Sequence, residues 1–179
     1  MRFLVTTMLT VVLATVSQAA DGAYTLTGEN TKIEFTGVKK DGKHVGGFKK
    51  LTGTATVPDG KITSGKIELT IEMASLYTDN PGLTGHLKNA DFFDVKTNPT
   101  SKFVTKSIEA DGGKFKVTGD LTMNGKTKSI SFPATITATG ESYTLAAEFK
   151  IDRTQFGMTY GKGNIEDDVA MTVKVEVKN

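Results

Sequence analysis

The sequence predicts an all-β protein, an antiparallel barrel of about eight strands with one short helix. The main observation is that apolar and polar residues alternate with a period of two, as in residues 115–123, where the odd positions are largely apolar. Successive side chains of a strand point to opposite faces, so each such segment has one apolar face. The second observation is that no long helical pattern is present to cover those faces. One-sided antiparallel strands must therefore stack or close on themselves.

The same alternation locates the individual strands. It predicts strands over residues 23–26, 32–38, 48–57, 62–73, 102–108, 114–123, 129–139, 142–151 and 168–178. Asp41-Gly42 and Asn124-Gly125 are typical of tight hairpin turns, and Pro58-Asp59-Gly60 forms another turn.

One segment interrupts the strand pattern with a predicted helix. Asn80 offers a capping side chain directly before Pro81, and proline is favoured in the first helical turn. Leu83 and Leu87 then lie four residues apart on one face, which predicts a helix to about Lys88. We expect this segment and the loop that follows it to cover or border the opening of the barrel.

The N-terminal segment resembles a signal peptide. Arg2 precedes an apolar run over residues 3–16, and Ser17-Gln18-Ala19 places small residues at the positions that a signal peptidase recognises. We expect cleavage after residue 19, one domain over residues 20–179, and a periplasmic or secreted protein; an uncleaved anchor is the alternative. The sequence has no cysteine, which excludes a disulfide framework and a lipoprotein anchor.

Composition argues against several classes of function. The net charge is only +2, and lysines alternate with acidic residues, so nucleic-acid binding has little support. His44 and His86 are the only histidines, which leaves few ways to build a nucleophile and its base. We expect no enzymatic activity and no cofactor. A metal site formed by His86, Asp91 and Asp94 is the alternative to a hydrogen-bonded loop, and we expect no metal there.

Small residues occupy many of the predicted inward positions of the strands. Alternating bulky and small side chains would leave a slender apolar hollow, whereas a filled core would close it. The small inward residues are Gly37, Gly53, Ala55, Gly119, Ala134, Ala138 and Ala147. The pattern favours a ligand carrier, and a filled barrel acting as a structural or protein-interaction module is the alternative.

Three stretches resemble the YceI-like, polyisoprenoid-binding family. They are residues 85–95 (GHLKNADFFDV), residues 117–128 (VTGDLTMNGKTK) and residues 151–158 (IDRTQFGM), and they follow the order found in the family. Together they span nearly the whole chain after the N-terminal segment. The sequence departs from the family at residues 38–40, where a histidine is frequent and this chain has Val-Lys-Lys.

The resemblance implies a lipocalin-like barrel with a hydrophobic channel. The implied function is non-enzymatic carriage of a long apolar lipid, a polyisoprenoid or an isoprenoid quinone. The resemblance also implies an association with envelope stress, in which a filled barrel would act as the alternative structural or protein-interaction module. The candidate ligand-binding residues are Phe35, Phe48, Leu69, Ile71, His86, Phe92, Phe103, Phe115, Leu121, Phe132, Phe149, Arg153 and Phe156.

Charged residues leave two questions open. Arg153 could pair with Asp167 or Asp168, or it could meet a polar lipid head group. The lysines between residues 39 and 50 could attract an anionic head group or a membrane surface in transient contact, or could be solvated turn residues. The sequence does not indicate the oligomeric state.

Overall fold

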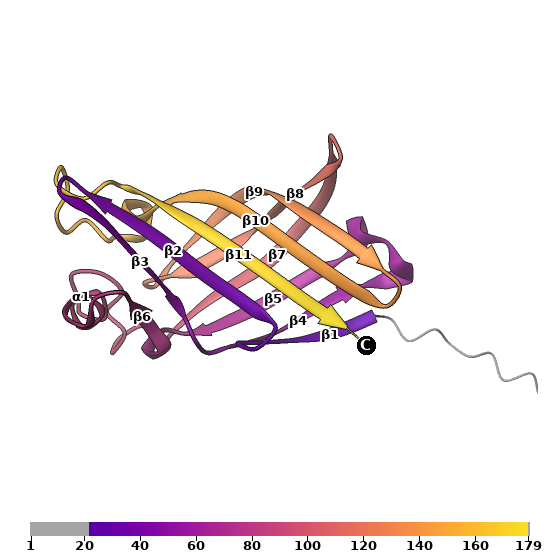
Figure 1. Ribbon diagram of the computed structural model, residues 1–179, viewed down its shortest axis with the longest axis horizontal. Helices are drawn as coiled ribbons and strands as arrows, with labels where there is room; N and C mark the ends of the chain where they lie inside the picture. Colours follow the sequence, from indigo (N-terminus) through magenta and orange to yellow (C-terminus); the bar gives the residue numbers. More distant parts are fainter. Residues whose placement is uncertain (1–21, 179) are drawn as a thin grey trace, which may run out of the picture.

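A computed structural model describes residues 22–178 as a curled antiparallel sheet with one α-helix (Figure 1). The predicted signal peptide lies outside the described residues. The strands are β1 Gly22–Thr27, β2 Thr31–Lys39, β3 Gly42–Phe48, β4 Leu51–Val57, β5 Lys66–Glu72, β6 Leu76–Thr78, β7 Thr100–Asp111, β8 Lys114–Met123, β9 Lys126–Thr139, β10 Ser142–Asp152 and β11 Asp168–Lys178. The helix α1 is Pro81–Leu87, and short 3₁₀ segments lie at Pro58–Gly60, Ile62–Ser64, Met73–Ser75 and Arg153–Phe156.

The strands form one sheet in the order β1-β4-β5-β7-β8-β9-β10-β11-β2-β3-β6. Every pairing is antiparallel, and β1 also lies beside β11 because the sheet curls. The prediction of an all-β antiparallel fold with one short helix is confirmed. No helix within residues 22–178 has the length and apolar character needed to cross a membrane.

The predicted number of about eight strands is wrong, because residues 22–178 form eleven. Between β3 and β4 the chain bends at Lys49-Lys50, whose amides donate to the backbone and side-chain oxygens of Ser75 at 3.3 and 3.0 Å. Ser75 itself belongs to the 3₁₀ turn that separates β5 from β6. These bends depend on contacts between segments distant in sequence, which the alternation does not record.

The helix begins where the sequence predicts. The side chain of Asn80 accepts a hydrogen bond from the amide of Leu83 at 3.0 Å, and Pro81 occupies the first turn. After the helix, the amide of Phe93 donates to the carbonyl of Leu87 at 3.1 Å and folds the following loop back onto it. The helix and this loop lie at the same end of the sheet as the β2–β3 hairpin (Figure 1).

Gly119 marks a close approach between strands instead of a hollow. It pairs with Thr105 beside a bulge in β7, between Thr105 and Ser107. A Cβ atom at Gly119 would overlap the ring of Phe103 and lie 2.6 Å from the carbonyl oxygen of Val104. Gly53 is similar, since a Cβ atom there would overlap the backbone of Glu68.

We expect Gly119→Ala to lower the free energy of unfolding by about 1–3 kcal/mol, because the added methyl group overpacks the β7–β8 contact. Gly37→Ala is the matched control, since nothing lies within 4 Å of a Cβ atom there. Urea unfolding of both variants measures the difference. Equal stability of the two variants would contradict this packing.

Candidate functional site

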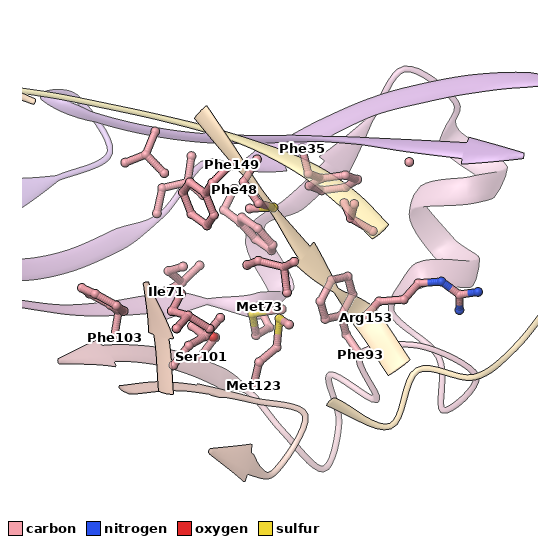
Figure 2. Close-up of a pocket in the computed structure, with 18 of the residues that line it drawn as sticks. Phe35, Phe48, Ile71, Met73, Phe93, Ser101, Phe103, Met123, Phe149 and Arg153 are labelled. Atoms are coloured by element: carbon pink, nitrogen blue, oxygen red, sulfur yellow. The ribbon is translucent and has the colours of Figure 1, made fainter. Parts of the chain in front are cut away.

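The inner face of the curled sheet surrounds an apolar cavity of about 290 Å³. Side chains from nine strands, from α1 and from the loops beside it form its wall. This volume lies near the lower end of the range for ligand sites, about 300–1,000 Å³. Figure 2 shows phenylalanine, isoleucine and methionine side chains converging on this space from several elements.

Aromatic pairs shape two parts of the wall. Phe132 stacks on Phe149 with ring centroids 4.3 Å apart and an interplanar angle of 10°. Phe48 lies between Phe35 and Phe93, with centroid distances of 6.0 and 6.1 Å. Rings in these arrangements are held by their neighbours, so they leave a defined space between them.

The buried polar side-chain atoms of the wall are already hydrogen-bonded to the protein. Ser101 is 2% exposed, and its hydroxyl donates to the carbonyl of Thr122 at 2.8 Å. Thr31 is 1% exposed, and its hydroxyl donates to the side-chain oxygen of Asn30 at 3.0 Å. No buried side-chain nitrogen or oxygen within residues 22–178 lacks a partner. The wall therefore favours an apolar occupant.

Arg153 is buried, and its guanidinium is saturated by the loop between β10 and β11. The side chain is 5% exposed, and all five of its N–H groups are used. Its Nε donates to the carbonyl of Glu166 at 3.0 Å. Its Nη1 donates to the carbonyls of Met158 at 2.6 Å and of Tyr160 at 2.9 Å. Its Nη2 donates to the carbonyl of Ile165 at 3.2 Å and to Asp167 Oδ1 at 3.4 Å.

Only the rest of the Arg153 side chain can border the cavity. Its guanidinium points away from the clustered phenylalanines in Figure 2. The two possibilities left open by the sequence are thus distinguished: the structure supports the pairing with Asp167, and no N–H group remains for a lipid head group. The structural role is larger than an ion pair, because four of the five acceptors are backbone carbonyls.

One end of the cavity lies where the β2–β3 hairpin, α1 and the loop before β11 come together. Gly37, His44, Leu83 and Ile165 line the cavity there. His44 Nδ1 lies 2.9 Å from Asp79 Oδ1, and Asp79 Oδ2 accepts from the amide of Val45 at 3.2 Å. This pair links the hairpin to the segment that leads into α1.

The cavity wall includes ten of the thirteen sequence-predicted ligand residues. Their role in binding stays a prediction. The ten are Phe35, Phe48, Leu69, Ile71, Phe92, Phe103, Leu121, Phe132, Phe149 and Arg153.

Phe115, Phe156 and His86 lie outside the wall. Phe156 is 1% exposed in the core, and Phe115 packs against that core from β8. The His86 ring lies beside Phe92 and Tyr160, with centroid distances of 5.1 and 4.9 Å. All three residues have apolar or aromatic neighbours, but none of them lines the cavity.

Several wall residues were not among the predicted ligand residues. The alternation alone could have located the β11 side chains, and also Met73 and Met123, which continue it at the ends of their predicted strands. The principal additions are Met73, Met123, Val169, Met171, Val173 and Val175.

His86 and Asp91, two of the residues of the alternative metal site, are hydrogen-bonded to each other. His86 Nε2 lies 2.8 Å from Asp91 Oδ2, which makes a two-residue hydrogen bond. Within residues 22–178, no three His, Asp or Glu side chains converge as metal ligands would. The hydrogen-bonded interpretation of this loop is the one that the geometry supports.

The sequence and the fold are similar to those of known proteins. The model of the YceI-like domain matches residues 24–177. This chain belongs to the YceI-like domain family. The resemblance found in the three sequence stretches is confirmed.

Relatives cover different shares of this YceI-like protein. The YceI protein of Escherichia coli O157:H7 is 30% identical over 137 residues, 73% of this chain and 72% of that protein. A UPF0312 protein of Pseudomonas putida is 39% identical over 97 residues, 54% of this chain and 50% of that protein. The chain thus spans about half the length of the Pseudomonas relatives that it matches.

Solved structures share the fold. BcnA of Burkholderia cenocepacia is 27% identical, with a TM-score of 0.75, over 83% of this chain and 96% of BcnA. A domain of Saccharophagus degradans described as polyisoprenoid-binding is 13% identical, with a TM-score of 0.69, over 88% of this chain and 98% of that domain. At that identity the second likeness shows the fold alone.

We expect Arg153→Lys to lower the free energy of unfolding by about 2–4 kcal/mol, because a lysine cannot serve five acceptors and leaves carbonyls unpaired. Deuterium exchange should rise between residues 157 and 167. Lys150→Ala, which removes an exposed contact 3.9 Å from Asp168, is the control and should change stability by less than about 1 kcal/mol. An Arg153→Lys variant with wild-type stability and exchange would show that the guanidinium does not organise this loop.

Hydrogen bonds from His44 and from the Val45 amide hold the pKa of Asp79 below its ordinary value of 3.8. Because this pKa is lower in the folded state, the ionised carboxylate stabilises the contact above about pH 3.8, and the effect is lost as pH falls through the folded value. We expect exchange at the Val45 amide to rise in that acidic window. Asp79→Asn should remove most of this pH dependence; an unchanged profile would contradict the assignment.

Proposed function

We propose that this YceI-like protein is an exported, non-enzymatic carrier that binds a long apolar lipid, an isoprenoid chain, in the cavity. The observation that carries the proposal is an apolar cavity of about 290 Å³ whose buried polar side-chain atoms are already paired. A preformed apolar site with few free polar groups binds by burial of hydrocarbon. Family membership and the fold shared with a polyisoprenoid-binding domain support the isoprenoid as the ligand class.

The cavity volume indicates how much lipid it can hold. A cavity of about 150 Å³ holds benzene with its six carbons, so 290 Å³ corresponds to about twelve carbons. At about 0.8 kcal/mol per buried CH₂, twelve carbons contribute about 10 kcal/mol. Association costs at least ~4 kcal/mol. The remaining ~6 kcal/mol corresponds to a dissociation constant of tens of micromolar. The carbons beyond the first twelve would extend from the opening or require further space.

The proposal also includes export of the protein from the cytoplasm. The basic residue, apolar run and small residues over residues 1–19 support a cleaved signal peptide and a periplasmic or secreted carrier. The helix α1 and its loop contribute Leu83, Leu87, Phe92 and Phe93 to the wall, which supports their role as a cover of the opening.

The test is extraction of lipid from the protein purified from its own compartment, followed by mass spectrometry. We expect an isoprenoid lipid with the wild type. Gly37→Phe should reduce the loading about tenfold or more, because the ring would occupy about half of the cavity volume. A Cβ atom at Gly37 has nothing within 4 Å, so this variant should fold normally.

Thr36→Phe is the matched control, because the neighbouring residue on β2 faces the other side of the sheet, beside the exposed Val45. It should retain wild-type loading. A wild-type protein that carries no lipid from several hosts would contradict the carrier. Greater stability of Gly37→Phe in that case would favour the structural or protein-interaction module instead.

A further inference from the structure

A second, smaller apolar cavity of about 50 Å³ lies at the opposite end of the sheet. Its wall includes Tyr24 of β1 and Ile62 of a 3₁₀ turn, and β1 lies at the far end from α1 in Figure 1. The rings of Tyr24 and Tyr143 pack edge to face there, with centroids 5.4 Å apart. The interior therefore has a near chamber behind α1 and a far chamber behind these tyrosines.

Four apolar side chains border both chambers. They come from strands on different sides of the curled sheet, β1, β5, β10 and β11, so they separate the two spaces as a partition. The four are Leu26, Ile67, Leu145 and Val175. Leu26 is 1% exposed, and Leu145 and Val175 are 8% and 9% exposed.

The backbone at Ile67 is fixed by an unusual contact. The regular β5–β7 ladder ends with the pair Glu68 and Val104, and the bulge in β7 follows. There the buried hydroxyl of Thr105 accepts from the amide of Ile67 at 3.1 Å and donates to its carbonyl at 3.1 Å. One side chain thus satisfies both backbone groups of Ile67, at the point where the strands separate.

We propose that Ile67 determines the length of apolar chain that the protein binds, with the other three partition residues completing the barrier. This inference rests on the proposed lipid-carrier function. By the benzene comparison, the near chamber accepts about twelve carbons. Replacing Ile67 by alanine would add room for about five carbons. About two of them would occupy the far chamber, and three would occupy the space of the Ile67 side-chain carbons beyond Cβ. Removing Ile67 would therefore admit one further isoprene unit.

The experiment measures binding of geraniol, farnesol and geranylgeraniol, with two, three and four isoprene units, by calorimetric titration of delipidated protein. In the wild type we expect affinity to level off between geraniol and farnesol. By the same arithmetic, wild-type protein should bind farnesol about sixteenfold more tightly than geraniol, because two further carbons are buried at about fourfold each. In Ile67→Ala we expect farnesol to bind about sixtyfold more tightly than it binds the wild type, because three more carbons are buried at about fourfold each. Geraniol affinity should be nearly equal in both proteins.

Ala55→Leu provides the control in the Ile67→Ala background. Ala55 pairs with Ile67 across β4 and β5 and lines only the far chamber. The added side chain should refill that space and restore the wild-type plateau without altering the near chamber. Such a rescue would not follow from a general loosening of the core.

The results distinguish a failure of the lipid-carrier function from a failure of the role of Ile67. If none of the three alcohols binds the wild type, the lipid-carrier function itself fails. If they bind with a plateau that Ile67→Ala leaves in place, or if Ala55→Leu does not restore it, the carrier stands and the role of Ile67 is overturned.

Discussion

The structure depends on the constraint that a single antiparallel sheet must bury its apolar face without a second layer. The only α-helix in residues 22–178 has seven residues, too few to cover eleven strands. The sheet therefore curls until its inner face meets itself, and bends divide long strands into shorter ones. A curved surface lined by large side chains fills unevenly, since stacked rings such as Phe132 and Phe149 occupy one part of the interior and leave space elsewhere.

Polar groups near this interior are held by the protein itself. Arg153 joins five acceptors of one loop, and Thr105 satisfies both backbone groups of Ile67. Ser101 is bonded to the neighbouring strand. Each bond removes a group that would otherwise require water or a polar ligand in the cavity. The same bonds that stabilise the loops and bulge thus keep the ligand space apolar.

The sequence predicts the direction of side chains much better than their position. The period of two locates the strands and their inner faces, and Asn80 and Asn124-Gly125 locate the helix start and a hairpin because those signals are local. The inward-facing Phe115 nevertheless does not line the cavity, since the pattern does not indicate how far along the sheet the cavity extends. Phe156 lies in the 3₁₀ segment after β10, outside the alternation of any strand, and packs in the core. Gly119 illustrates the same limit, because the space left by its missing side chain is filled by Phe103 from another strand.

The two ends of the cavity are closed by partly different interactions. At the far end, Tyr24 and Tyr143 pack together and the partition is apolar, so opening it would expose hydrocarbon to water. At the near end, the exposed pair of His44 and Asp79 joins the hairpin to the segment before α1. An exposed hydrogen-bonded contact contributes little net stability because water replaces its hydrogen bonds. The near end also contains the buried side chains of Leu87 and Phe92. The two ends therefore share apolar packing, and they differ in the exposed polar contact that only the near end has.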